Sequence, residues 1–403
     1  MVFACQRDSF LKEFTSLVVS CNPAEYKTNI NGKKQKVNCF EVILKDTILF
    51  PEGGGQPCDY GLLNDIPVIQ VLRRGSEAVH YVEKPINEGE QVLQKVDWER
   101  RLDHMQQHSG QHLITALADS EFGYSTTSWW LGEEISFIEL DTPKMTVEEL
   151  NTLEEIVNEK IRQALSVSVK VYEEGDPELT ESRTRGLPKD HKGSVRVITI
   201  ENIESNMCCG THVSNLAQLQ VVKLMGFEKG KKNKINMNFL VGNRVLNKIE
   251  KLYKNELSLN LLLRNGPDMH QELIEKLQKT VKISNKKADL MMKDLVTLQV
   301  KSLKSMAPYP KVYTVHRPDA EIDYINMFIK ELNDPNILIL FTVGEKDGHM
   351  VLMGPEDKVA EFGPKLAEIL EGKGNGKGNR YQAKVKNLKN VNKAELLIKE
   401  AAL

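Results

Sequence analysis

Over the first 97 residues the apolar positions come in short runs that suit strands better than helices. Phe40, Val42 and Leu44 lie at alternate positions, which is the spacing of a strand with one buried face. The segment 51–57, between two apolar runs, is rich in glycine and proline, and this composition marks a turn or loop. Several short strands separated by such loops predict a β-barrel-like domain over residues 1–97.

From residue 98 the apolar residues recur every three or four positions, which predicts helices. One helix begins at Trp98, and a second is expected at 146–165, where Thr146 and Glu149 form a capping box. Four strands are predicted from short apolar runs at 167–172, 195–200, 218–225 and 235–240. This alternation of helices and strands predicts an α+β domain over residues 98–242.

The rest of the chain divides into a helical part and a mixed part. Apolar residues at three- and four-residue multiples around the turn sequence 265–268 predict a helical hairpin over 243–307, with a coiled-coil seam. Such a seam can also hold two copies of a chain together, so the hairpin is the candidate site of homo-oligomerisation. An α/β domain over 308–403 follows from strand patterns at 337–342 and 349–353 and a helix pattern at 358–370. The predicted fold class is therefore α+β and multidomain.

The composition is that of an ordinary globular protein. The 403 residues are 40% hydrophobic and 27% charged, and a chain of this length is expected to form several domains. No stretch reaches the roughly 20 apolar residues that cross a bilayer, and no secretory signal is visible at the N-terminus. The six cysteines are irregularly placed, which does not suit a disulfide framework. We therefore expect a cytoplasmic protein without a membrane partner.

Two short clusters hold four of the nine histidines and two of the six cysteines. They are His104-Met-Gln-Gln-His108-Ser-Gly-Gln-His112 and Cys208-Cys209-Gly-Thr-His212. Residues four apart on a helix share one face, so His108 and His112 can bind a single ion, and His104 lies on the same face. In the second cluster either cysteine can join the histidine. The residues alone leave both choices open.

The chemistry of these clusters favours zinc. Thiolate and imidazole are ligands that zinc prefers, whereas magnesium and calcium prefer oxygen. A metalloprotease is less favoured, because its helix motif requires a glutamate directly after the first histidine and Ser109 occupies that position. The two clusters therefore predict a Zn²⁺ site.

The motifs resemble those of a known family. His-Ser-Gly-Gln-His-Leu from residue 108 and Cys-Cys-Gly-Thr-His-Val from residue 208 are similar to the editing-site motifs of alanyl-tRNA synthetases and of their free-standing relatives, the alanyl-tRNA editing proteins (AlaX family). The segment 50–57 resembles the glycine motif of this family's N-terminal barrel, and 372–380 resembles its C-terminal glycine-rich loop. The order and spacing match over essentially the whole chain. With no aminoacylation domain before these motifs, the expected form is the long, free-standing one.

The resemblance implies a ligand set and a reaction. The implied zinc ligands are His108, His112, Cys208 and His212. His104 then lies outside the shell, while Cys209, at a position where the family often has glycine, could compete for the metal. The implied reaction is hydrolysis of the ester in tRNA(Ala) mischarged with serine, with glycine as a second candidate amino acid. Four protein ligands fill a tetrahedral shell, whereas catalytic zinc usually keeps one position open, so zinc could activate water or position the substrate.

Serine is larger than alanine, so its selection requires a hydrogen bond to its hydroxyl group rather than steric exclusion. The segment 125–128 supplies hydroxyl side chains at the place where the family has a serine-sensing residue, and Thr127 is our candidate. A polar loop without this role is the alternative. Gly54 and Gly55 would let the backbone approach the substrate closely, or they would only form a hairpin connection.

Two basic stretches are candidates for contact with tRNA. One lies at 229–234, and the other runs from 373 to 389 without an acidic residue. Clustered lysine and arginine side chains bind phosphates. The alternative is that these charges only form a solvated surface without an RNA partner. The predicted RNA-binding residues are Lys373, Lys377, Arg380 and Lys384.

Taken together, these features predict a zinc-dependent hydrolase that edits mischarged tRNA(Ala). The alternative is a non-catalytic tRNA-binding protein in which zinc only stabilises the fold. A generic zinc hydrolase of small esters or peptides is the third hypothesis for the function. It ranks last because it leaves the basic C-terminal stretch unexplained.

Overall fold

The computed structural model describes residues 2–30, 33–173 and 194–400. The chain forms two compact units, Met1–Ser258 and Leu259–Leu403, and each contains helices and sheets. The predicted mixed α+β class is therefore confirmed, and the two compact units are compatible with the predicted multidomain organisation. The finer division into four domains stays a prediction. No helix in the described part is long and apolar enough to span a membrane.

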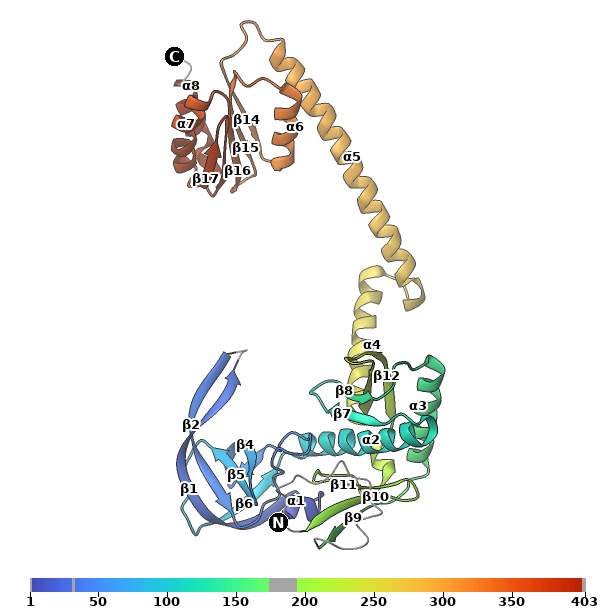
Figure 1. Ribbon diagram of the computed structural model, residues 1–403. Helices are drawn as coiled ribbons and strands as arrows, with labels where there is room; N and C mark the ends of the chain where they lie inside the picture. The colour runs from blue at the N-terminus through green and yellow to red at the C-terminus, as the bar shows by residue number, and fades with distance from the viewer. Residues whose placement is uncertain (1, 31–32, 174–193, 401–403) are drawn as a thin grey trace. The chain divides into compact units, whose positions relative to one another are not determined.

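Six strands of the first unit close into a barrel in the order β1-β2-β5-β4-β3-β6 (Figure 1). They are β1 (Glu13–Ile30), β2 (Lys33–Leu44), β3 (Gly61–Leu63), β4 (Ile66–Arg74), β5 (Glu77–Val82) and β6 (Gln91–Val96). A short helix, α1 (Ala4–Arg7), precedes them. Side chains alternate between the two faces of each strand, and Val18, Val42 and Val71 are among the fully enclosed residues of the barrel core.

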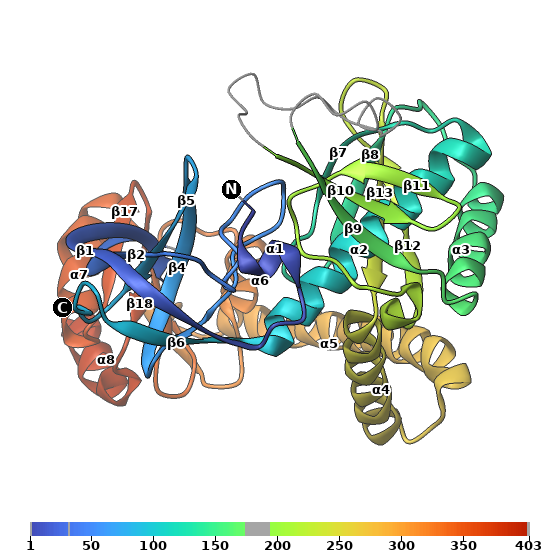
Figure 2. The same ribbon diagram turned by 90° about the horizontal axis from the view of Figure 1, so that it is seen from below.

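Helix α2 (Trp98–Phe122) follows the barrel and runs between two further sheets (Figure 1, Figure 2). The Asp97 side chain caps its start by accepting a hydrogen bond from the N–H of Arg100. Gly123 ends the helix with a φ of 69°, a left-handed conformation that glycine adopts without strain. Residues 104–114 are all buried, so α2 is a central core helix rather than a surface helix with one apolar face.

The two sheets beside α2 complete the first unit. One has the strand order β12-β13-β8-β7 and the other β11-β10-β9. Their strands are β7 (Thr126–Trp130), β8 (Ser136–Leu140), β9 (Val167–Tyr172), β10 (Val195–Ile200), β11 (Glu204–Met207), β12 (Val222–Lys229) and β13 (Ile235–Val241), with a short 3₁₀ helix, η2 (Leu216–Leu219), before β12. Helix α3 (Val147–Arg162) begins at the predicted capping box, in which Thr146 and Glu149 each accept the other's backbone N–H.

Two predicted elements of this part differ from the structure. The strand predicted at 218–225 begins only at Val222, because η2 and the positive φ of Gln220 (63°) interrupt the extended chain. The hydroxyl-rich segment 125–128, for which a polar loop was the alternative, forms the start of β7 from Thr126, and β7 pairs with β8. The first two predicted strands match β9 and β10.

A buried ion pair joins the barrel to α2. Asp59 follows the glycine motif 51–57, Arg101 lies in the first turn of α2, and neither side chain is exposed to solvent. Arg101 Nε donates to Asp59 Oδ2 at 2.9 Å, and Arg101 Nη1 donates to the carbonyl of Ser9 at 2.8 Å. These contacts fix the orientation of α2 against the barrel, and α2 in turn carries two of the predicted metal ligands.

The boundary between the two units lies within helix α4 (Asn243–Leu263). A turn that contains a 3₁₀ helix, η3 (Pro267–Met269), leads into helix α5 (His270–Lys304). The two helices and the turn between them are thus where the sequence placed them. Leu277 and Leu298, two of the apolar residues whose spacing predicted the coiled-coil seam, are 55% and 65% exposed on α5.

The second unit is built on a five-stranded sheet in the order β14-β15-β16-β18-β17. Its elements are β14 (Val312–Arg317), α6 (Ile322–Leu332), β15 (Leu338–Val343), β16 (Gly348–Met353), α7 (Glu356–Ile369), β17 (Lys373–Lys377), β18 (Arg380–Val385) and, after a 3₁₀ helix η4 (Leu388–Asn390), α8 (Val391–Glu400). Helix α6 and the end of α5 pack on one face of the sheet, and α7 and α8 pack on the other. Helices thus cover both faces of the sheet, in the α/β pattern predicted for the C-terminal part.

The glycine-rich segment 372–380 is a β-hairpin rather than a loop. Strands β17 and β18 pair antiparallel through it, and Gly378 has a φ of 64° between them. A Cβ on Gly374 would lie 2.2 Å from the carbonyl of Gln382, and one on Gly376 would lie 2.7 Å from the ring of Tyr381. The glycines are therefore needed for close packing between the strands, a role that their composition alone did not distinguish from loop flexibility.

Candidate metal centre

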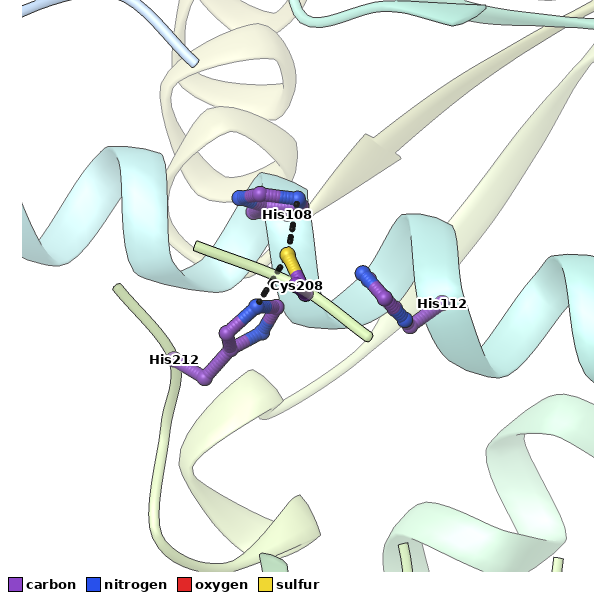
Figure 3. A group of neighbouring side chains, drawn as sticks. All are labelled: His108, His112, Cys208 and His212. Atoms are coloured by element: carbon purple, nitrogen blue, oxygen red, sulfur yellow. Dashed lines mark hydrogen bonds between the residues drawn. The ribbon is translucent and has the colours of Figure 1, made fainter. Parts of the chain in front are cut away.

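Two segments bring four potential ligands together. Helix α2 carries His108 and His112, four residues apart on one face. The segment after β11 carries Cys208 and His212 (Figure 3). The four ligand atoms lie within 4.8 Å of one another. This set is the one that the sequence resemblance implied.

The spacing and chemistry of these atoms fit a zinc ion. Cys208 Sγ lies 3.4 Å from His108 Nε2 and 3.2 Å from His212 Nε2. Zinc bonds of about 2.3 Å to sulfur and about 2.0–2.1 Å to nitrogen, arranged as a tetrahedron, place sulfur and nitrogen roughly 3.5 Å apart. One thiolate with three imidazoles is also a donor set that zinc prefers over oxygen-seeking ions.

Burial keeps the rings of His108 and His212 in the neutral form, which is the form that binds a metal. Desolvation, reinforced by neighbouring histidines and by Arg196, lowers the pKa of His108 and of His212 well below the usual range. Both rings are therefore neutral at physiological pH, and only a neutral ring has a lone pair for a metal. In the absence of a cation, burial and the neighbouring Cys209 raise the pKa of the Cys208 thiol to about 12, although Arg196 opposes this effect. A bound cation would supply the charge that a thiolate needs there.

Hydrogen bonds on the far side of two rings aim their Nε2 atoms at the cluster. His212 Nδ1 lies 3.0 Å from Ser109 Oγ, which also accepts the N–H of Val213 at 3.1 Å. His108 Nδ1 lies 2.9 Å from Gln56 Oε1. Partners of this kind fix the tautomer and orientation of metal-binding histidines.

The geometry favours one answer to each of the two choices that the residues alone left open. Among the described residues, the metal-competent cluster includes Cys208 and excludes both His104 and Cys209. His104 is buried and its Nδ1 has no hydrogen-bond partner. Burial, with repulsion from Arg100 and other arginines, lowers the pKa of His104 to about 3, so it stays neutral in the core of α2.

The ligand segment around Cys208 is held by contacts with the N-terminus and β10. Arg196 Nη1 donates to the carbonyl of Cys208 at 2.7 Å, and Arg196 Nε donates to the carbonyl of Gln6 at 2.9 Å. Gln6 Nε2 in turn donates to the carbonyl of Cys209 at 2.7 Å. The segment is thus fixed by β10 and by Gln6, which lies 203 positions before Cys209.

The glycine motif forms a tight turn against this site. Gly53 and Gln56 exchange two backbone hydrogen bonds of 3.1 Å, and the φ angles of Gly54 and Gly55, 58° and 81°, are those of a type I′ turn. A Cβ on Gly54 would lie 2.7 Å from Cys209 Sγ, and one on Gly55 would lie 2.5 Å from the ring of Trp129. The turn type and the close packing both require glycine at the two central positions.

Trp129 links the turn to the ligands. Its ring lies 4.9 Å from that of His108, centroid to centroid. Neither Trp129 nor Gln56 was among the site residues that the sequence predicted. The only signal for Gln56 was its place inside the glycine motif, and Trp129 follows the hydroxyl-rich segment in which the prediction chose Thr127.

Thr127 lies on β7 with its hydroxyl engaged in the same sheet. Its Oγ1 donates to Glu139 Oε1 at 2.5 Å and accepts a hydrogen bond from Lys234 Nζ at 2.9 Å. Its role as the serine sensor stays a prediction, as do the roles of Gly54 and Gly55 at the substrate. A second group of polar side chains lies beside the ligands on α2, where Gln111 Nε2 donates to Thr115 Oγ1 at 2.8 Å and Gln111 Oε1 is buried without a partner.

The predicted RNA-binding residues lie on one face of the β17–β18 hairpin in the second unit. Lys373 pairs directly with Lys384, and Lys377 pairs with Arg380. All of β17 is exposed, and the residues that alternate with the basic positions on β18 point into the core. Like charges directly opposite each other on a sheet are destabilising, so this face concentrates positive charge at a cost to the fold.

Known proteins match both the ligand segment and the whole chain. The family described as the threonyl and alanyl tRNA synthetase second additional domain matches residues 195–238. The chain is 50% identical over 402 residues to alanyl-tRNA editing protein Aarsd1 of Danio rerio, covering 99% of this chain and 98% of that protein. Aarsd1 of Mus musculus is 49% identical over 403 residues, with the same coverage. Alanyl-tRNA editing protein AlaX-L of Pyrococcus horikoshii is 27% identical over 293 residues, 70% of this chain and 69% of that protein.

Proposed function

Because this chain belongs to the family of alanyl-tRNA editing proteins, we propose that it hydrolyses the ester of tRNA(Ala) mischarged with serine, at a zinc ion. One observation carries the proposal: two histidines of α2 converge with a cysteine and a histidine of the segment after β11. The reaction adds water across the ester, releasing free serine and tRNA(Ala) with its terminal hydroxyl group restored. Gly-tRNA(Ala) is the second candidate substrate.

The proposed zinc ligands are His108, His112, Cys208 and His212. When bound, zinc supplies a Lewis acid that can polarise the ester carbonyl or hold the substrate in place. Gln56 and Ser109 hold two of the imidazole rings with Nε2 toward the centre. The ring of Trp129 covers one side of His108, which limits the access of bulk water to the ligands.

Selection of serine is assigned in this proposal to Thr127. Its hydroxyl donates to Glu139 and accepts from Lys234, which leaves one lone pair that can accept the hydroxyl proton of a substrate serine. Alanine lacks that proton, and a site built around a substrate hydroxyl can reject the analogue without it by up to about 10⁴-fold. Gly54 and Gly55 are proposed to line the same site with backbone.

Contact with tRNA is assigned to the basic face of the β17–β18 hairpin. Lys373, Lys377, Arg380 and Lys384 share that face, and phosphates would relieve the repulsion between the paired charges. Replacing Lys373 and Lys384 with glutamine should weaken tRNA binding equally for all acyl groups. It should also reduce the dependence of log K on log salt concentration by about two.

The direct test is deacylation of Ser-tRNA(Ala), Gly-tRNA(Ala) and Ala-tRNA(Ala) by the full chain. We expect rapid loss of the seryl ester and little loss of the alanyl ester. His112→Ala should abolish turnover, whereas His104→Leu, which changes a buried histidine outside the cluster, should retain it. Persistence of the seryl ester at stoichiometric protein would refute the proposal.

One observation favours a second candidate, a non-catalytic tRNA-binding protein with a structural zinc. Four protein ligands fill a tetrahedral shell, which is the pattern of structural sites. That candidate predicts tight tRNA binding without turnover, and unfolding when zinc is removed. A chain that stays folded without zinc but loses deacylation would exclude it.

We also propose that copies of the chain associate through α5. Ile274, Leu277 and Val281 follow the three–four spacing of a coiled-coil seam and are 40%, 55% and 57% exposed. Leu277→Lys should then shift the protein to a smaller species in sedimentation velocity, whereas Lys282→Glu, which lies beside the seam, should not. A monomeric wild-type chain would refute this part of the proposal.

A further inference from the structure

Gln56 occupies an unusual position for a residue of the barrel. It is the last residue of the glycine turn and is 1% exposed. Its side chain leaves the barrel and forms its hydrogen bonds with Thr211 and His108, in the ligand-bearing part of the unit. Nε2 donates to Thr211 Oγ1 at 2.8 Å, while Oε1 lies 2.9 Å from the backbone nitrogen of Thr211 and 2.9 Å from His108 Nδ1.

These contacts determine which nitrogen of the His108 ring carries the proton. The backbone N–H of Thr211 can only donate, so the Gln56 atom beside it must be the carboxamide oxygen. That oxygen can only accept, so His108 Nδ1 must carry a proton and donate it to Gln56. His108 Nε2 is then the unprotonated nitrogen, and it is the atom that faces Cys208 Sγ at 3.4 Å. The tautomer of His108 thus follows from a single backbone amide.

The ligand segment is shaped to admit this contact. A Cβ on Gly210 would lie 2.2 Å from His108 Cε1 and 2.7 Å from Gln56 Oε1. Position 210 must therefore lack a side chain for the segment to close over the pair. On the other side, the type I′ turn at Gly54 and Gly55 fixes where Gln56 begins.

We propose that Gln56 is a positioning residue of the metal centre, through which the glycine motif of the barrel holds His108 in the tautomer and orientation that bind zinc. This proposal rests on the metal site of the proposed function, but not on the identity of the substrate. It assigns the glycine motif a role that does not require contact with the acyl group. The barrel is then part of the metal centre, not only a neighbouring domain.

The test measures metal affinity in the full chain without tRNA, by competition with a chromophoric zinc chelator. Gln56→Leu keeps the approximate size of the side chain but removes the acceptor, and should weaken zinc binding about 10- to 100-fold, the usual effect of losing such a partner. Gln56→Glu keeps an acceptor for His108 and for the Thr211 amide, and should bind zinc at least as tightly as the wild type. When cobalt replaces zinc, the visible absorption spectrum of Gln56→Leu should differ from that of the wild type, whereas that of Gln56→Glu should not.

Gln94→Leu is the matched control. Gln94 is a fully buried glutamine of the same barrel, bonded to Thr47 and Ile48, and it contacts none of the four ligands. Its loss should lower the melting temperature and leave zinc affinity unchanged. Equal losses of zinc affinity in Gln56→Leu and Gln94→Leu would reduce Gln56 to a structural role, and unchanged affinity in a folded Gln56→Leu would overturn the proposal.

A measurement on the wild-type chain keeps the proposal testable if the leucine variant does not fold. Nitrogen-15 spectra of histidine-labelled protein should place the His108 proton on Nδ1, with or without metal. A proton on Nε2 would overturn the proposal. Because neither experiment uses tRNA, a chain that passes both yet leaves Ser-tRNA(Ala) intact would refute the proposed substrate and not the role of Gln56.

Discussion

Asp59 and Arg101 form an ion pair that is completely shielded from solvent and joins the barrel to the start of α2. Arg101 also donates to the carbonyl groups of Ser9 and Ile48, so each of its three side-chain nitrogens has a hydrogen-bond partner within the protein. The pair therefore fixes the helix that carries His108 and His112 relative to the turn that carries Gln56. Damage to this contact is expected to affect both stability and the metal centre.

Asp59→Ala should lower the free energy of unfolding by about 3–5 kcal/mol, because it leaves the Arg101 charge buried without a partner. Chemical denaturation followed by circular dichroism measures the change. Glu25→Ala breaks the exposed pair of Glu25 with Lys36 and serves as the control, for which no measurable loss is expected. A loss of similar size in both variants would contradict the role of burial.

His104 and His112 lie on the same helix but should respond oppositely to replacement. His112→Leu removes a ligand and should weaken zinc binding by more than the roughly 100-fold that loss of an outer partner can cause. His104→Leu places an apolar group where a neutral, buried ring now lies, and should leave zinc stoichiometry at one. If the His104 variant stays folded but loses zinc, His104 must be a ligand, and the ligand set would lie one turn earlier along α2.

Gly55→Ala should be damaging and Gly53→Ala should not. An alanine at 55 would have to adopt a φ of 81° and place its Cβ 2.5 Å from the ring of Trp129. The backbone alone costs roughly 1–2 kcal/mol, and displacement of the ring adds to that. At Gly53 the nearest atom to a new Cβ is 3.8 Å away and φ is not positive. Tryptophan emission should shift only in the Gly55 variant, and matching spectra for the two would refute the contact.

His80 should make the barrel sensitive to mild acid. Burial lowers its pKa from 6.5 to about 4, and its Nδ1 lies 3.1 Å from the carbonyl of Val42. The folded state therefore binds fewer protons than the unfolded state below pH 6.5, so the stability from this group is complete above that pH and falls as the pH approaches 4. The loss should be about 2 kcal/mol between pH 7 and pH 5.

Urea unfolding at both pH values checks this. His80→Gln, which cannot be protonated in this range, should lose that part of the pH dependence when compared under the same metal condition. An unchanged pH dependence in the variant would show that other buried histidines account for the acid sensitivity.

The local features of the site could be predicted from the sequence, whereas its long-range contacts could not. The pair His108 and His112 depends only on helical periodicity, and the capping box at Thr146 depends on residues three apart. Gln56, by contrast, contacts residues 52 and 155 positions away, and an isolated glutamine has no periodic signature. Its role appears only when the barrel is packed against α2.

The errors in predicted elements have similar causes. The strand expected at 218–225 was shortened by a turn at Gln220, and the positive φ of this residue has no apolar signature in the sequence. The segment 125–128 is polar, so its composition left a loop as the alternative, but pairing with β8 stabilises it as a strand. The glycines of β17 are needed for contact with Ala383 and Tyr381, a reason that depends on a partner strand.

The separation of the two ligand segments has a consequence for how the protein is made. Cys208 follows His108 by 100 residues, and the segment that holds it also depends on Gln6 and Gln56. While the ribosome is still adding residues before 208, only two of the four proposed ligands, His108 and His112, have been made, and two imidazoles form a weak and unselective site. On the proposed ligand set, firm metal capture must wait until His212 has emerged, when the barrel and α2 have already been made.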